Sequence, residues 1–175
     1  MLNFNHVSVL GVSGHRPSSL PGQYSEFASR ALVDTASYVL NLYRPEKVIS
    51  GMALGWDMAI AQCALEQGID LIAAVPFKGQ SQRWNAVDRA RYEAILSRAH
   101  QTVVVSSGSY SPQAMQKRNQ WMVNNCTQLL ALWNQNQARS GTKNCVNYAT
   151  AVGIKTFNCW NTFEHFYRLS CHMDT

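Results

Sequence analysis

The sequence predicts an α/β fold of the Rossmann-like type, with a mostly parallel sheet of about six strands and helices on both faces. Short apolar segments rich in β-branched residues alternate with longer amphipathic segments along the chain. Several of the short segments are almost continuously apolar, as strands are when helices cover both faces of a sheet. Neither a linker nor an internal repeat interrupts the chain, so we expect a single domain over residues 1–175.

The first half of the chain predicts three strands and two helices. In order, these are a strand at residues 6–12, a helix at 23–42, a strand at 47–50, a helix at 57–67 and a strand at 69–75. Apolar residues recur at helical spacing in both helices. Arg44-Pro45 stops the first helix, because proline disfavours the helical conformation of the residue before it. Gly68 is placed to end the second helix.

The second half continues the same alternation. In order, we expect a helix at residues 83–98, a strand at 102–105, a helix at 112–124, a strand at 128–133, a helix at 141–152, a strand at 155–158 and a short helix at 163–171. Pro112 suits the first turn of its helix, where a missing N–H group costs no hydrogen bond. Gly153 closes the helix that precedes the last strand.

The composition favours a globular, cytoplasmic protein. The chain is 46% hydrophobic and only 14% charged, and its five cysteines form no C-x-x-C pair, which indicates reduced thiols. The amino-terminal residues lack the features of a signal peptide. No segment approaches the run of about 20 apolar residues that spans a membrane. His165, Cys171 and His172 do not have a zinc spacing, so we expect neither a metal site nor another cofactor.

Positive charge gathers in the central part of the chain. Between Pro76 and Cys145 there are nine basic and two acidic residues, whereas the whole chain has a net charge of +5. Such a segment attracts a small anionic ligand or a nucleic acid. Solvated helix faces explain most of these charges equally well.

The turn at residues 50–57 is the first candidate for a binding site. It follows the apolar strand at 47–50 and precedes a helix, an arrangement that presents bare backbone N–H groups to an anion. Gly51 and Gly55 can adopt positive φ angles and leave room for a ligand against the main chain. The alternative is an ordinary tight turn, because the segment is neither a full G-x-G-x-x-G motif nor a P-loop.

In parallel α/β sheets, ligands bind at the carboxyl ends of the strands, near the point where the strand order reverses. The loops that leave those ends are therefore the candidate binding segments. They span residues 13–17, 51–57, 76–84, 106–119 and 134–142. These loops also contain the candidate binding residues that are named below.

Five motifs occur in this region of the predicted fold. In chain order they are Gly14-His15-Arg16, Ser50 to Asp57, Pro76-Phe77, Arg118-Asn119 with Met122, and Ser140-Gly141-Thr142. Together they resemble the YpsA-like branch of the SLOG superfamily, the Rossmann-like group that also contains the DprA DNA-processing proteins and the LOG phosphoribohydrolases. The resemblance covers nearly the whole chain. It implies one SLOG-like domain that binds a nucleotide or nucleotide-derived small molecule, and it implies no settled reaction.

The candidate ligand-binding residues come from these motifs and from the loop after the third strand. They are Gly14, His15, Arg16, Gly51, Ala53, Gly55, Trp56, Asp57, Pro76, Trp84, Arg118, Asn119, Ser140, Gly141 and Thr142. Gly141-Thr142, at a helix start, would offer N–H groups and a hydroxyl to a phosphate. That role and the roles of Arg118 and Asn119 rest mainly on the resemblance.

Several candidates also have a simpler explanation. Arg16 can offer a bidentate fork to a phosphate, or form a surface ion pair of little energetic value. Trp56 and Trp84 can stack on a base or pack in the core. His15 can titrate near neutral pH and donate a proton, or serve only as a polar loop residue.

Asp57 is the one candidate for a catalytic residue. A carboxylate in the first turn of a helix stabilises that helix by about 0.3–1 kcal/mol, which is reason enough for its presence. If the turn binds a nucleotide, Asp57 would accept hydrogen bonds from ribose hydroxyls or from a base. It can also act as a general base through a water molecule.

Three functions follow for the chain. The first is a binding module, a sensor, carrier or sink for a nucleotide-like molecule. The second is a LOG-like nucleotide N-glycosidase, although Cys145 stands where the LOG motif P-G-G-x-G-T-x-x-E has its glutamate and the doubled glycine is missing. The third is DprA-like binding of single-stranded nucleic acid, based on the basic centre and its aromatic residues Trp84, Tyr92, Tyr110 and Trp121. No membrane partner is expected, and a homo-oligomer stays open.

Overall fold

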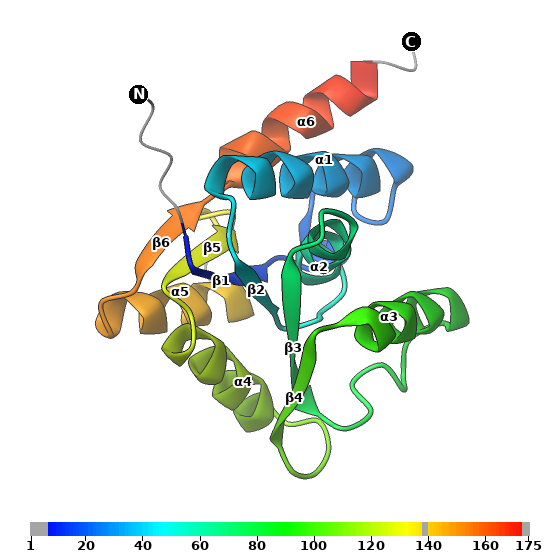
Figure 1. Cartoon of the computed structure of the whole chain (residues 1–175). Coiled ribbons are helices and arrows are strands. Elements are labelled where there is room, and N and C mark those ends of the chain that lie inside the picture. Colours follow the sequence, from blue (N-terminus) through cyan, green and yellow to red (C-terminus); the bar gives the residue numbers. More distant parts are fainter. Residues whose placement is uncertain (1–6, 138–139, 173–175) are drawn as a thin grey trace.

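A computed structural model describes residues 7–137 and 140–172 of the chain (Figure 1). The described residues form one six-stranded sheet in the order β4-β3-β2-β1-β5-β6, and every neighbouring pair is parallel. The strands are β1 (Val9–Gly14), β2 (Lys47–Ser50), β3 (Asp70–Phe77), β4 (Gln101–Ser106), β5 (Gln128–Leu132) and β6 (Lys155–Asn158). The predicted Rossmann-like α/β fold is confirmed.

Helices cover both faces of this sheet (Figure 1). One layer contains α1 (Glu26–Tyr43), α2 (Trp56–Glu66), α3 (Ala86–Arg98) and α6 (Trp160–His172), and the other contains α4 (Pro112–Asn124) and α5 (Gly141–Ala151). The chain runs outward from β1 to β4, returns to β5 beside β1, and continues to β6 in the opposite direction. Right-handed crossovers in opposite directions place their helices on opposite faces.

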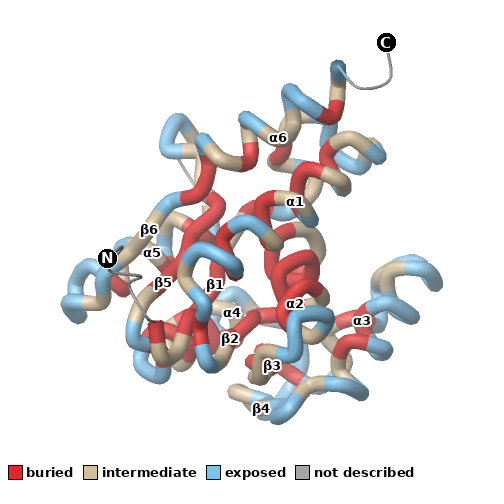
Figure 2. Tube along the Cα trace, turned by 45° about the horizontal axis from the view of Figure 1, so that its top comes forward, coloured by how far each residue is buried: buried red, intermediate tan, exposed pale blue. Residues whose placement is uncertain are grey.

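The core lies on both sides of the central strands. In α1 the buried residues recur every three or four positions, so one stripe of the helix faces the sheet. Helix α2 is buried almost throughout and contains the small residues Ala59, Ala61 and Ala64, which allow it to lie close to β1, β2 and β3. Figure 2 shows the buried residues gathered in β1, β2 and α2, whereas α3 is mostly exposed. The edge strand β4 is also largely exposed.

Some element bounds differ from the predicted ones for local reasons. Strand β1 continues to Gly14 because Ser13 and Gly14 pair with β5, although they were expected in a turn. Strand β3 continues through Pro76, which was expected in a loop, and ends at Phe77. Helix α3 begins only at Ala86, because Asn85 caps it by accepting a hydrogen bond from Asp88 N at 2.9 Å.

Further differences concern one helix start, a short extra helix and three residues outside the described part of the chain. Helix α6 begins at Trp160, three residues earlier than expected, and a short 3-10 helix at Pro17–Ser19 was not predicted. His6, expected in the first strand, lies outside the described residues, as do Ala138 and Arg139, which stand where the LOG motif has its doubled glycine. No helix in the described part of the chain combines the length and apolar character needed to cross a membrane.

Candidate functional site

A cavity of about 420 Å³ opens at the carboxyl ends of β1 and β5. The strand order reverses between these two strands, so the cavity occupies the position where α/β folds bind ligands. Residues that the sequence singled out form much of its wall: Gly14, His15, Arg16, Ala53, Asp57, Arg118, Asn119, Ser140, Gly141 and Thr142. The structure thus brings together ten candidates, of which the first and the last are more than a hundred residues apart in the chain.

Asp57 and Arg118 form a buried ion pair in this wall. Asp57 lies in the first turn of α2, Arg118 lies in α4 on the other face of the sheet, and they are 4% and 5% exposed. Arg118 Nη1 is 4.0 Å from Asp57 Oδ2 and donates a hydrogen bond to the carbonyl of Gly51. Arg118 Nε donates to Asn119 Oδ1 at 2.9 Å. Arg118 is therefore held by groups on both sides of the sheet.

The Asp57 carboxylate keeps one oxygen for another partner. Its Oδ2 accepts a hydrogen bond from Ala53 N at 3.4 Å, and the backbone N–H of Gly14 also stabilises the carboxylate, although the buried Oδ1 makes no hydrogen bond of good geometry among the described residues. Burial raises the pKa of Asp57 to about 6, and the positive charge of Arg118 only partly opposes this rise. A buried acceptor without a donor is costly, so a ligand donor at Oδ1 would be stabilised.

The N-terminus of α5 forms another part of the cavity wall. Ser140 caps this helix by accepting a hydrogen bond from Lys143 N at 3.0 Å, and Asn119 Nδ2 donates to Gly141 O at 3.4 Å. A side chain added at Gly141 would meet no atom within 4 Å, so the first turn of the helix is open to the cavity. The first N–H groups of a helix have no partner within it, and they favour an anion.

The glycines of the 50–57 turn do not leave room for a ligand, contrary to the sequence-based expectation. A Cβ atom on Gly51 would overlap the guanidinium of Arg118, so the absent side chain leaves room for that arginine. Gly55 has a positive φ of 91°, and a Cβ atom there would lie 2.8 Å from His15 O. Both positions therefore serve close packing between parts of the protein, and neither residue lines the cavity.

Two further candidates lie away from the cavity. Trp56 is 0% exposed and its ring packs against Gly14, which places it in the core. Pro76 is buried within β3. Neither side chain is among the residues that line the cavity at β1 and β5.

His15 lines the cavity, but its ring is already engaged. Nε2 of His15 accepts a hydrogen bond from Asn134 N at 2.9 Å, and the ring packs edge-on against Trp160. Burial lowers the pKa of His15, so the imidazole is kept neutral with its proton on Nδ1. These contacts give His15 a role in holding the β1 and β5 loops together.

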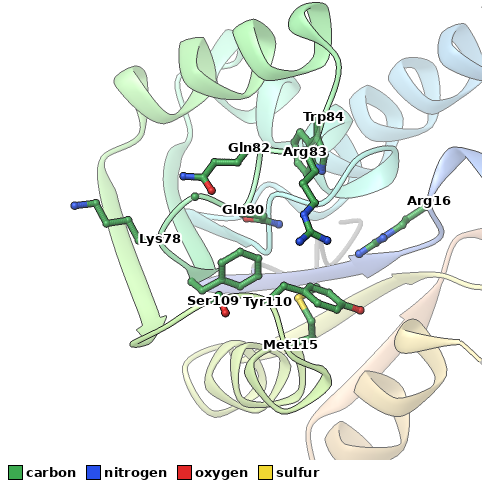
Figure 3. A pocket seen from close by; sticks show the side chains of 11 residues that line it. Arg16, Lys78, Gln80, Gln82, Arg83, Trp84, Ser109, Tyr110 and Met115 are labelled. Atoms are coloured by element: carbon green, nitrogen blue, oxygen red, sulfur yellow. The ribbon is translucent and has the colours of Figure 1, made fainter.

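A second pocket, of about 370 Å³, adjoins the first (Figure 3). It lies between the β3–α3 and β4–α4 loops, and its wall is formed by Arg16, Phe77, Lys78, Gly79, Gln80, Gln82, Arg83, Trp84, Ser109, Tyr110 and Met115. Arg16, Tyr110 and Met115 also line the first cavity. The two pockets are therefore neighbouring lobes of one cleft.

Most residues of this second lobe escaped sequence reasoning. Of its lining, Arg16 and Trp84 were singled out as contacts to a nucleotide, and Tyr110 was named as an aromatic contact to nucleic acid. Gln80 anchors the loop, because its Nε2 donates to Gly51 O at 3.2 Å and its Oε1 accepts from the Tyr92 hydroxyl. The available signal was the location of these residues in the loops at 76–84 and 106–119, which follow two neighbouring strands.

The remaining aromatic candidates for nucleic-acid binding differ in position. Trp84 and Tyr110 line the second lobe. Tyr92 is 4% exposed and packs against the Trp84 ring, and Trp121 packs against a buried cluster that contains Met122. Only two of the four aromatics are therefore placed to meet a ligand in the cleft.

Comparison with known proteins agrees with the Rossmann-like fold. Residues 11–158 match the YpsA family model, described as a SLOG family. The chain belongs to this family, and the predicted resemblance is confirmed. It is similar to the uncharacterized SPbeta prophage-derived protein YoqJ of Bacillus subtilis, with 34% identity over 125 residues that cover 62% of this chain and 70% of YoqJ.

Solved structures share the fold at low sequence identity. DNA processing protein A (DprA) of Streptococcus pneumoniae matches with a TM-score of 0.60 and 17% identity, over 95% of this chain and 56% of DprA. The molybdenum cofactor binding protein of Rippkaea orientalis matches with a TM-score of 0.55 and 15% identity, over 93% of this chain and 84% of that protein. The chain thus spans little more than half of DprA. At these identities the likeness concerns the fold.

Proposed function

We propose that this protein binds a nucleotide or nucleotide-derived small molecule in the cleft at β1 and β5. The observation that carries the proposal is that the buried Asp57 carboxylate, whose Oδ1 makes no good hydrogen bond among the described residues, lines the same cavity as the open N-terminus of α5. One part of the wall thus accepts hydrogen bonds and another attracts an anion. A nucleotide supplies both partners, with hydroxyl donors on its ribose and negative charge on its phosphate.

The arrangement also indicates the orientation of the ligand. A phosphate next to the Asp57 carboxylate would be repelled, whereas the first turn of α5, with Gly141 and Thr142, suits it. The ribose hydroxyls would then face Asp57 and Ala53. Arg16, which also lines the cavity, is available for a second phosphate contact.

A thermal-shift series tests this proposal, because a ligand that binds only the folded state raises the melting temperature. Nucleoside monophosphates, nucleoside diphosphates, cyclic nucleotides and ADP-ribose are each added to the protein. At least one should raise Tm, and Asp57→Asn should abolish that rise. Glu93→Gln, at an exposed acid in α3 outside both lobes, is the matched control. No shift with any of these compounds would refute the proposal.

A second candidate function is cleavage of a nucleotide N-glycosidic bond, with Asp57 as the acid or base. The observation in its favour is the pKa of about 6, since a carboxyl group that titrates near neutral pH suits proton transfer. Cys145 cannot take the place of the missing LOG glutamate, because it is 0% exposed and burial raises the pKa of its thiol to about 11. The test is chromatography of nucleoside monophosphates incubated with the protein. Free base that appears with the native protein and not with Asp57→Asn would favour this activity over simple binding.

A further inference from the structure

The second lobe of the cleft also contains groups that can bind parts of a nucleotide, but they differ from those of the first lobe. Its described lining includes three basic residues and no acidic residue. Figure 3 shows the guanidinium groups of Arg83 and Arg16 reaching into the same space, whereas Lys78 points away from it. Two guanidinium groups that face one space repel each other, and an anion between them would remove this repulsion.

The same lobe contains a surface suited to an aromatic ring. Trp84 lies beside Arg83, and Tyr110 and Met115 lie across the pocket from them (Figure 3). The Trp84 ring is fixed by its edge-on packing against Tyr92, with ring centres 5.2 Å apart. Tyr110 is 61% exposed, so its ring is accessible to a ligand. Bases stack on such rings regardless of their sequence identity.

The two lobes meet at Arg16, Tyr110 and Met115. Each lobe alone, at about 370 and 420 Å³, falls within the size range of small-molecule sites, which is about 300–1,000 Å³. The first lobe offers a helix N-terminus for a phosphate and Asp57 for hydroxyl groups. The second offers two arginines for phosphate and two aromatic rings for a base. A mononucleotide would leave one of these sets unused.

We propose that the cleft binds a dinucleotide whose two nucleosides are joined by a pyrophosphate, one nucleoside in each lobe. The linking phosphates lie between the N-terminus of α5 on one side and the guanidinium groups of Arg16 and Arg83 on the other, and the base of the second nucleoside stacks against Trp84 and Tyr110. This inference rests on the proposed function, because the first nucleoside occupies the cavity of Asp57 and α5. It adds the class of the ligand and assigns the β3–α3 loop as a specificity element.

Isothermal titration calorimetry tests the inference with matched pairs of probes. Each of the four common nucleoside monophosphates is compared with the symmetric dinucleotide in which a pyrophosphate joins two copies of the same nucleoside. For at least one base the dinucleotide should bind about tenfold or more tightly than the monophosphate, as expected when a further base stacks and charged hydrogen bonds form.

Two variants locate the gain in affinity. Arg83→Gln and Trp84→Leu should each reduce the ratio between the two affinities about tenfold. Arg89→Gln, at an exposed arginine in α3 that lines neither lobe, should leave this ratio at the native value. Thr142→Val, in the first lobe, should weaken both probes.

The outcomes separate this inference from the function on which it rests. If monophosphates bind as tightly as every dinucleotide, the second subsite is refuted and nucleotide binding stands. If neither kind of probe binds, the dinucleotide proposal fails, and nucleotide binding fails with it when the thermal-shift series is negative as well. If a single-stranded oligonucleotide binds more tightly than any dinucleotide, the two lobes follow a polynucleotide and the dinucleotide proposal is refuted.

Discussion

Asp57 is a buried carboxyl group whose surroundings disfavour its ionised form. Burial raises its pKa to about 6, above that of an exposed carboxyl group, so the folded state retains a proton that the unfolded state loses. The stabilising contribution of this proton is complete below about pH 4 and is lost as the pH rises through about 6. The cost of the ionised form reaches the order of 3 kcal/mol at neutral pH.

We therefore predict that Asp57→Asn changes the pH dependence of stability. The free energy of unfolding of the native protein, relative to that of the variant, should fall by the order of 3 kcal/mol between pH 4 and pH 7. Urea denaturation of both proteins at several pH values measures this difference, and all shared titrations cancel in it. A difference that stays constant over this range would contradict the raised pKa.

Gly51 shows that a glycine in a βα turn can serve the protein instead of a ligand. A methyl group at this position would overlap the Arg118 guanidinium and displace it from the Gly51 carbonyl. We predict that Gly51→Ala destabilises the protein by about 1–3 kcal/mol, as other overpacked sites do. Gly141→Ala is the control, because nothing lies within 4 Å of its added methyl. Equal stability of the two variants in urea denaturation would refute this explanation of Gly51.

At the scale of single elements, the α5 N-terminus combines a structural role with the proposed binding role. Ser140 caps α5 and Ser25 caps α1, each through a hydrogen bond to a backbone N–H, at 3.0 and 3.2 Å. We predict that Ser140→Ala and Ser25→Ala each cost about 1 kcal/mol of stability. Only Ser140→Ala should also weaken binding of a nucleotide, because Ser25 lies outside both lobes. Equal loss of binding in both variants would show that the N-terminus of α5 does not bind the ligand.

The ends of helices and strands were predicted correctly where the sequence carries a clear start or stop signal. Helix α4 begins at Pro112 as predicted, because proline and the Ser111 cap mark its start unambiguously. Strand β1 was predicted to end too early, because Gly14 reads as a turn residue although it pairs with Leu132. Strand β3 was predicted too short for a similar reason, since Pro76 reads as a strand end. Pairing between strands decides such positions, and a single sequence does not contain it.

At the scale of the whole molecule, the alternation of elements predicted the location of the cleft but not its construction. Parallel strands bring their following loops to one edge of the sheet, and the described parts of these loops do meet there. The sequence did not reveal that Arg118 fills the space at Gly51, because the two lie 67 residues apart. It also did not reveal the second lobe, since Gln80, Arg83 and Tyr110 become neighbours only through the order of β3 and β4.

The Asp57–Arg118 pair joins the two helical layers beyond the end of the sheet. Asp57 belongs to α2 in one layer and Arg118 to α4 in the other, so the pair closes the fold at the edge where the cleft lies. Removal of one partner from a buried pair leaves an uncompensated charge and typically costs about 3–5 kcal/mol. We predict that Arg118→Met lowers the free energy of unfolding by this amount, partly through the lost hydrogen bonds to Gly51 and Asn119.

A double-mutant cycle separates the pairwise part of this loss. The double variant Asp57→Asn/Arg118→Met contains no unpaired buried carboxylate. Its loss of stability should therefore be smaller than the sum of the single losses by about 1–3 kcal/mol. Urea denaturation of the four proteins gives this coupling. The exposed pair of Arg30 and Glu26, at 3.3 Å within α1, supplies a control cycle whose coupling should not exceed about 0.5 kcal/mol. Additive losses at Asp57 and Arg118 would show that the two helical layers are joined by packing alone.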